Sequence, residues 1–207
     1  NVPTARRLAA GISAPTAVFS AELCEEQEIE RLFCFAEERF GGVDILINNA
    51  GAALPQQLTQ ETSSSDFDLL FALDVRAPFL CSRRALPHML RQGYGRIINI
   101  SSVWGVAGAS CEVAYSAAKA ALIGMTKALA KETAPAGVTV NCVAPGVIES
   151  PMNAHLPPED LAGLAAQTPA GRLGTPEDVA AAVSFFSGGA AGFTTGQVLL
   201  VDGGFAG

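Results

Sequence analysis

The chain alternates between two patterns of apolar and polar residues. Short, nearly continuous apolar runs rich in β-branched residues are separated by longer stretches with helical periodicity. Continuous apolar runs are typical of strands covered on both faces, as in a parallel sheet. Strands are predicted at 16–20, 43–48, 96–101, 138–143 and 197–202, and helices at roughly 25–39, 64–91, 112–134 and 176–187. This order predicts an α/β fold, a three-layer doubly wound parallel sheet.

The least regular part of the chain is residues 149–172, which hold four of the twelve prolines and follow a predicted strand end. Ligands of doubly wound sheets lie outside the carboxyl ends of the strands. We therefore expect a lid-like segment here, with a short helix at 158–166, although an ordinary surface excursion would give the same pattern. Neither a repeat nor a linker divides the chain, so residues 1–207 are expected to form a single domain.

Composition limits the function classes. Of the 207 residues, 49% are apolar and 16% are charged, which is typical of a globular protein with a large core. The net charge of -7 argues against a general nucleic-acid binder. The apolar runs are too short to span a membrane, and the five cysteines show neither a metal-binding nor a CxxC spacing. We expect a cytoplasmic protein with reduced thiols that binds neither membrane nor nucleic acid.

Several chemistry-bearing residues are predicted at one edge of the sheet. Three predicted strands end in Asn48-Asn49-Ala50-Gly51, in Ser101-Ser102 and in Pro145-Gly146, and parallel strands bring these ends together. The next helix carries Tyr115 and Lys119, whose four-residue spacing puts them on one face. Alone, each feature could be a turn, a helix cap, a loop bend or a surface pair. Their convergence is the argument for a site.

Six ordered motifs carry a family resemblance that extends over essentially the whole chain. With these motifs the chain resembles the short-chain dehydrogenase/reductase family, and most of all its 3-oxoacyl-(acyl carrier protein) reductase branch. The 13-residue step from Ser102 to Tyr115 agrees with that family. The motifs are "NNAG" (48–51), "GRIINISS" (95–102), "YSAAK" (115–119), "VTVNCVAPG" (138–146), "GRLGTPEDVA" (171–180) and "TGQVLLVDGG" (195–204).

The sequence holds no G-x-G-x-x-G phosphate-binding turn. The family begins with a strand, a T-G-x-x-x-G-x-G turn, a helix and a second strand. The resemblance thus implies that the first β-α-β unit is missing and that the domain is incomplete at its N-terminus. The position that usually separates NADP from NAD would lie in that unit.

The resemblance implies an oxidoreductase that transfers a hydride between nicotinamide and a carbonyl or secondary alcohol. Tyr115 would donate the proton, which requires its pKa to fall from about 10 toward neutrality. A cation one turn away favours the phenolate, and Lys119 would supply it while also binding the nicotinamide ribose. Ser102 would hold and polarise the substrate carbonyl.

One catalytic position departs from the family. Where relatives usually carry an Asn in the long helix after "NNAG", this chain has Asp74. Asp keeps the size of Asn but replaces an amide with a charge, and an ionised Asp74 would stabilise the Lys119 ammonium. The alternative is a helix-interior Asp without a catalytic part.

The resemblance also implies a set of cofactor contacts, with NADP(H) favoured over NAD(H). Asn49, Ala50 and Gly51 would meet the adenosine ribose and pyrophosphate, and Glu22 and Leu23 the adenine. The nicotinamide would be lined by Tyr115, Lys119, Pro145, Gly146, Ile148 and Ser150.

Two functional hypotheses follow. The first is an NADP(H)-dependent reductase of a 3-oxoacyl thioester or a similar ketone, as in fatty acid biosynthesis, with a homotetramer built through 64–91, 112–134 and the C-terminal strand. Arg83, Arg84 and Arg172 are candidate contacts for an acyl carrier partner. The second is a catalytically impaired member acting as a binding or scaffold protein, favoured by Asp74 and by the missing turn, and opposed by Ser102, Tyr115 and Lys119.

Overall fold

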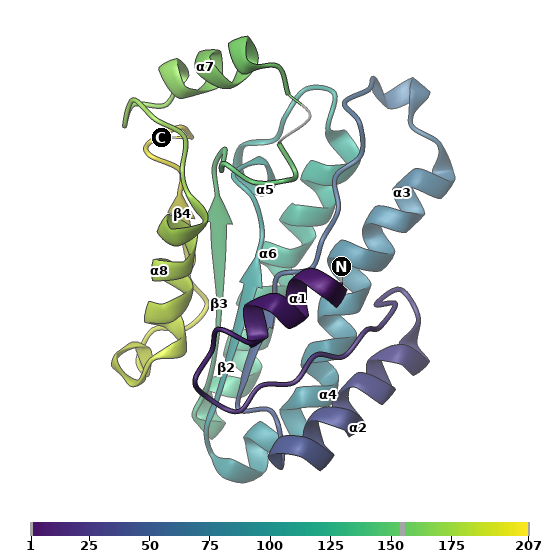
Figure 1. Ribbon diagram of the computed structural model, residues 1–207, viewed down its shortest axis with the longest axis vertical. Helices are drawn as coiled ribbons and strands as arrows, with labels where there is room; N and C mark the ends of the chain where they lie inside the picture. Colours follow the sequence, from purple (N-terminus) through teal and green to yellow (C-terminus); the bar gives the residue numbers. More distant parts are fainter. Residues whose placement is uncertain (1, 154–155, 207) are drawn as a thin grey trace.

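The chain folds around a parallel sheet of four strands, β1 (Ile45–Asn48), β2 (Gly95–Ile100), β3 (Val138–Pro145) and β4 (Val198–Val201), in that spatial order (Figure 1). The computed structural model describes residues 2–153 and 156–206. Four of the five predicted strands are present. The α/β doubly wound class is confirmed, because each strand pairs in parallel with the next and helices intervene.

Helices cover both faces of the sheet (Figure 1). On one face, Ile97 and Val140 pack in a core cluster with residues of α2 (Glu26–Phe40) and α4 (Ala77–Gln92). On the other face, Ile98 and Val143 pack against α8 (Pro176–Ser187). Neighbouring residues of a strand point to opposite faces, so covering both faces requires the continuous apolar runs seen in the sequence.

Helix ends follow local sequence signals. Thr175 caps α8 in a reciprocal pair with Asp178, and Pro176 occupies the first helical position, as predicted. Gly41 ends α2 and Gly93 ends α4 in the left-handed conformation that glycine tolerates. The remaining helical segments are α1 (Val2–Ala9), η1 (Thr59–Glu61), α3 (Ser64–Phe71), the π-helical turn η2 (Ala72–Arg76), α5 (Trp104–Ala107), α6 (Val113–Thr133), η3 (Ala134–Ala136), α7 (Pro158–Gln167) and η4 (Gly189–Ala191).

The predicted strand at 16–20 is wrong. These residues have no regular secondary structure, and Phe19 packs instead on Phe35 of α2. A strand forms only where a neighbour accepts and donates main-chain hydrogen bonds, and no sheet strand pairs with this segment. The apolar run therefore covers helix α2 without joining the sheet.

Strand β1 forms one border of the described sheet. It pairs with β2 on one side only, and Ile45 and Ile47 on it are 42% and 46% exposed. Across the described ranges, no helix has both the length and the hydropathy needed to cross a bilayer, and no group of three or more His, Cys, Asp or Glu could hold a metal ion.

Candidate active site

The carboxyl ends of β1 and β2 and the first turns of α6 meet where the sequence predicts a site. Ser102 follows β2, and α6 begins at Val113, so Tyr115 lies in its first turn and Lys119 one turn later. Asp74 lies in η2, which packs against α6. The structure therefore brings together all four predicted catalytic side chains, Ser102, Tyr115, Lys119 and Asp74.

Tyr115 is the candidate proton donor. The expected fall of the Tyr115 pKa toward neutrality is not found: burial raises the pKa to about 12, and the nearby Ser102 side chain opposes this shift. The carboxylates of Asp74 and Glu112 push the pKa in the same direction as burial. Lys119 Nζ lies 5.5 Å from the Tyr115 ring centroid, so a cation faces the ring. The main chain N–H of Trp104 donates to Ser102 Oγ at 3.2 Å, which fixes the serine next to the phenol.

Lys119 is held at several points. Its Nζ donates to the carbonyl oxygen of Ile100 at 3.4 Å and lies 3.2 Å from Asp74 Oδ2. Its main-chain carbonyl accepts a 2.8 Å hydrogen bond from Ser101 Oγ. A Cβ added at Gly105 would lie 2.8 Å from the Lys119 carbonyl carbon, so α5 and α6 touch backbone to backbone here. The ammonium therefore has a fixed place beside the strand ends.

Asp74 is buried away from solvent. It is 1% exposed and lies in the π-helical turn between α3 and α4. Its Oδ1 accepts a 3.0 Å hydrogen bond from the N–H of Ala52, while Oδ2 lacks a hydrogen-bond partner among the described residues and faces only Lys119. Burial raises the pKa of Asp74, and the Lys119 ammonium opposes that rise. π-Helical turns inside α-helices frequently lie at functional sites.

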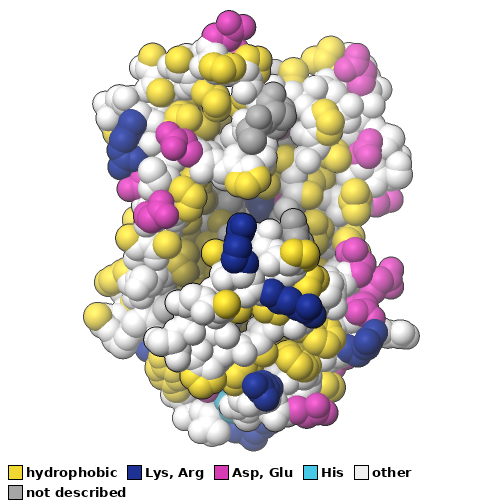
Figure 2. Space-filling model, in the orientation of Figure 1, with side chains coloured by type: hydrophobic (Ala, Val, Ile, Leu, Met, Phe, Trp, Pro, Cys, Tyr) yellow, Lys and Arg dark blue, Asp and Glu magenta, His cyan; other side chains and the backbone are white. Residues whose placement is uncertain are grey.

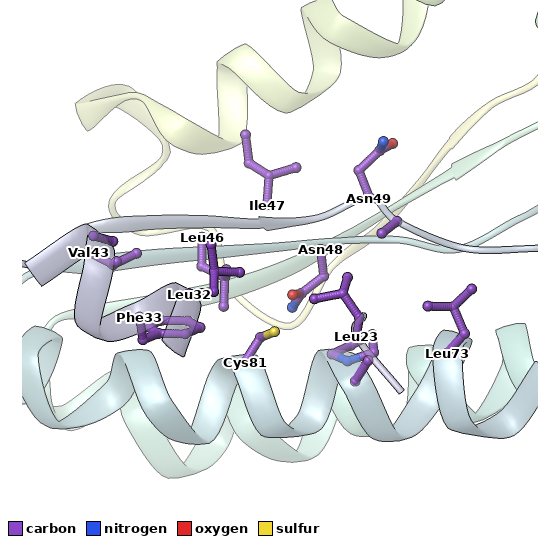
Figure 3. Close-up of a pocket in the computed structure, with 14 residues that line it drawn as sticks. Leu23, Leu32, Phe33, Val43, Leu46, Ile47, Asn48, Asn49, Leu73 and Cys81 are labelled. Atoms are coloured by element: carbon purple, nitrogen blue, oxygen red, sulfur yellow. The ribbon is translucent and has the colours of Figure 1, made fainter. Parts of the chain in front are cut away.

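A cavity of about 240 Å³ lies between β1, α2 and α4, and three predicted cofactor residues, Leu23, Asn49 and Ala50, line it. Figure 3 shows Asn48 pointing toward Cys81 and α4, whereas Asn49 points to the opposite side of the strand. Gly51 follows at the strand end, where a Cβ would lie 2.9 Å from Asp74 Oδ1. The backbone at 49–51 thus joins the cavity to the candidate catalytic residues.

Glu22 lies apart from this cavity lining. Its Oε1 accepts a hydrogen bond from the N–H of Cys24 at 3.2 Å, and its side chain is exposed.

The other predicted nicotinamide contacts follow the end of β3. Pro145 accepts a hydrogen bond from the N–H of Val103, which ties this end to the Ser102 loop. A Cβ at Gly146 would lie 2.8 Å from the Asp202 Cα. Ile148 pairs with Gly174 in an isolated bridge, and the carbonyl of Ser150 accepts from Asn153. Residues 154–155 of the expected lid lie outside the described residues.

The three arginines considered for an acidic partner are paired within the chain. Arg83 contacts Glu26 and Arg84 contacts Glu30 and Glu37, all on α2. Arg172 pairs with Asp178 at 2.7 Å. Exposed basic residues occur elsewhere, at Arg6 and Arg7 in the last turn of α1. Figure 2 shows basic side chains over α1, beside a hollow in this face.

Sequence reasoning missed the supports of the site. Ser101 and Gly105 position Lys119, but a serine pair and a glycine after a strand are too common to indicate this role. A buried hydrogen-bond network connects β1, β2 and α6. In it, Asn48 Nδ2 donates to Asn99 Oδ1 at 2.8 Å, and Asn99 Nδ2 donates to Thr126 Oγ1 at 2.9 Å. Paired asparagines at matching positions of two predicted strands were the available signal.

Comparison with known proteins identifies the family. Residues 2–206 match a family model described as enoyl-(acyl carrier protein) reductase. The chain is similar to (2S)-[(R)-hydroxy(phenyl)methyl]succinyl-CoA dehydrogenase subunit BbsD of Thauera aromatica, with 44% identity over 167 residues, 81% of this chain and 66% of that protein. It is 41% identical to the Vibrio cholerae 3-oxoacyl-[acyl-carrier-protein] reductase over 178 residues, 86% of this chain and 72% of that one.

The fold comparison agrees. A structure named "ElxO with NADP Bound" superposes with a TM-score of 0.90 at 30% identity and covers 99% of this chain and 85% of that one. The chain spans just under two thirds of the length of the Thauera relative. The site geometry, the family model and these relatives lead to one conclusion: the chain belongs to the short-chain dehydrogenase/reductase family.

Proposed function

We propose that the protein is an NADP(H)-dependent oxidoreductase that interconverts a ketone and a secondary alcohol. The observation that carries the proposal is the grouping of Ser102, Tyr115 and Lys119 at the strand ends: the Ser102 hydroxyl lies near the Tyr115 phenol and lowers its pKa, and the Lys119 ammonium faces the phenol ring. Family membership makes hydride transfer the expected reaction of such a set.

The chain's own residues supply acid catalysis and orientation. Bound nicotinamide would supply or accept the hydride. Tyr115 would give its proton to the carbonyl oxygen, and Ser102 would donate a hydrogen bond to the same oxygen. Lys119 would stabilise the resulting phenolate, because an opposite charge nearby favours the ionised form. In the reverse direction the Tyr115 phenolate would accept the alcohol proton.

Several features of the structure support binding of a dinucleotide with flat ring systems. The cavity beside β1 is lined mainly by apolar side chains with two asparagines, and Gly51 lets backbone approach closely. Leu23, Asn49, Ala50 and Gly51 are proposed for the adenosine half, with Glu22 at its exposed rim. Pro145, Gly146, Ile148 and Ser150 are proposed for the nicotinamide half. NADP(H) is favoured because the similar structure carries NADP in its name.

A 3-oxoacyl thioester is the proposed substrate class. The names of both curated relatives specify an acyl thioester, on coenzyme A in one case and on acyl carrier protein in the other. One acts on a hydroxyl and the other on an oxo group, so both names fit the same alcohol–ketone pair. The residues 149–172 are proposed to close over such a substrate, since they follow the end of β3.

A homotetramer is the proposed assembly. Phe67, Leu69 and Phe79 are exposed on α3 and α4, and Phe193 and Leu199 are exposed at the C-terminal edge of the sheet. Exposed apolar side chains grouped on two faces suit two kinds of subunit contact. Analytical ultracentrifugation should show a tetramer, and a stable monomer would contradict it.

Turnover tests the proposed function. NADPH oxidation should be followed with a panel of ketones that includes acetoacetyl thioesters, for the protein and for Tyr115→Phe. We expect thioester-dependent oxidation that falls by at least about a hundredfold in the variant. Absence of turnover in both, with NADPH still bound, would support the scaffold alternative.

A further inference from the structure

Asp74 and Lys119 form an ion pair inside the protein. Their side chains are 0% and 7% exposed, and Asp74 Oδ2 lies 3.2 Å from Lys119 Nζ. Among the described residues, that oxygen has no hydrogen-bond partner. Two opposite charges that are close together and shielded from solvent stabilise one another, because a buried charge without a partner is energetically costly.

The same carboxylate also reaches the loop that follows β1. Its Oδ1 accepts the Ala52 N–H at 3.0 Å. A Cβ at Gly51 would lie 2.9 Å from Asp74 Oδ1 and 3.1 Å from Lys119 Nζ, so the main chain passes directly over the pair. One carboxylate therefore links η2, the loop after β1 and the catalytic helix α6.

We propose that Asp74 is a positioning residue that acts through Lys119, with an ionised carboxylate that holds the ammonium in place and offsets part of the positive charge that Lys119 presents to Tyr115. This inference deepens the proposed oxidoreductase function and rests on it only for the role of the phenol. The family's usual amide at this position could accept the Ala52 N–H but could not offset the charge.

The charges around Tyr115 decide the sign of the effect. Lys119 faces the ring from α6, and Ser102 meets the hydroxyl from the loop after β2. Asp74 from η2 and Glu112 from the start of α6 are the carboxylates that raise the pKa of Tyr115. The Lys119 charge also acts on Cys142 of β3, whose pKa it lowers against the larger effect of burial. Removing the Asp74 charge takes away a nearby anion and leaves Lys119 without its counter-charge, and both changes favour the phenolate.

The phenol can be titrated without turnover. The chain has two tyrosines, so Tyr94→Phe leaves Tyr115 as the single one. In that background, the ring carbon bearing the hydroxyl is labelled with ¹³C and followed by NMR against pH, without cofactor. We expect Asp74→Asn to lower the pKa of Tyr115 by about one unit. This shift corresponds to about tenfold more phenolate at a given pH below the midpoint of the titration.

Matched acid-to-amide variants separate this effect from a general loss of charge. Glu112→Gln should shift the titration less, because Asp74 contributes more than Glu112. Asp68→Asn, on the preceding turns of α3, should leave it unchanged. An unchanged or raised pKa of Tyr115 in Asp74→Asn, or an equal shift in Asp68→Asn, would overturn the proposal.

A second variant keeps the test decisive. Far-ultraviolet circular dichroism at each pH checks that the variants remain folded. If Asp74→Asn does not fold, Asp74→Ser serves the same purpose, since its hydroxyl is neutral and can accept a hydrogen bond. For the active protein, the alkaline limb of carbonyl reduction should also move to lower pH in the neutral variant. If the alkaline limb of the pH–rate profile stays in place while the NMR titration of Tyr115 moves, Asp74 does not act in catalysis, although its electrostatic coupling to Tyr115 is supported.

Discussion

The hydroxyl of Ser101 donates a hydrogen bond of 2.8 Å to the main-chain carbonyl oxygen of Lys119. Both residues are buried, and the bond joins the end of β2 to the second turn of α6. It fixes α6 by its backbone, at the residue whose side chain carries the positive charge of the candidate site.

Ser101→Ala should weaken both stability and catalysis. Losing one buried hydrogen bond should lower the free energy of unfolding by about 1 kcal/mol. A small displacement of Lys119 and Tyr115 should lower kcat/KM on the order of tenfold. Urea denaturation and steady-state kinetics measure the two effects. Ser110→Ala, at an exposed position of the following loop, is the control and should change neither. Normal kinetics in Ser101→Ala would show that α6 is held without this bond.

Gly105→Ala should be harmful although alanine is the better helix former. The added Cβ would lie 2.8 Å from both the Lys119 carbonyl carbon and Ser101 Oγ, so α6 must move away. Gly124→Ala, inside α6, meets no atom within 4 Å and should stabilise the protein by about 0.5–1 kcal/mol. Thermal unfolding of both variants checks the opposite signs. If both substitutions stabilise the protein, the close approach at Gly105 does not constrain the fold.

Removing one member of the buried ion pair should cost more than removing both. Lys119→Met leaves the Asp74 carboxyl buried without a counter-charge, and the free energy of unfolding should fall by about 3–5 kcal/mol near neutral pH. Lys119→Met with Asp74→Leu should recover much of that loss. Urea denaturation measures each variant.

The same substitution should also show a pH dependence of known sign. In Lys119→Met, burial raises the folded-state pKa of Asp74 above its unfolded value. That carboxyl then favours folding at pH below the unfolded pKa and loses this contribution as the pH rises through the folded pKa. The deficit should therefore shrink as the pH falls toward the ordinary pKa of Asp, about 4. A deficit independent of pH would mean that lost packing, not the charge, is the cause.

The cysteines should differ sharply in reactivity. Burial raises the pKa values of Cys81 and Cys142 to about 11, which leaves little thiolate at neutral pH, and access is blocked as well. Cys34 is exposed on α2. A thiol reagent should label Cys34 in the native protein, and Cys81 and Cys142 only after denaturation, as read by peptide mass spectrometry. Native labelling of Cys142 would reveal local opening around β3.

Much of the fold followed from the sequence because the relevant physics is local. Strands β1 to β4 were predicted from their continuous apolar runs, and for β2 and β3 the reason is that helices cover both of their faces. The N-terminus of α8 was predicted from Thr175, Pro176 and the acids of its first turn. The segment 16–20 has the same composition as a strand, but strand formation depends on a partner that composition does not report.

The site followed from topology more than from single residues. Parallel strand ends share an edge, so placing Ser102 and the residues 49–51 near Tyr115 needed only the parallel direction of the strands. What the sequence could not give were contacts that depend on fractions of an ångström. Ser101 reaching a main-chain carbonyl and Arg84 paired with two acids of α2 are of this kind, whereas the pairing of Asp74 with Lys119 was anticipated from the family position of Asp74.

The π-helical turn at Ala72–Arg76 makes the site sensitive to chain length. A π turn holds one more residue than an α turn, and removing that residue would let α3 and α4 run on as one regular helix. Each residue of an α-helix advances the side-chain direction by about 100°. A single deletion between 72 and 76 would then rotate Asp74 away from Lys119, or rotate all of α3 relative to α4, with almost no change in composition. Insertions and deletions at this turn should be far less tolerated than substitutions at most of its positions.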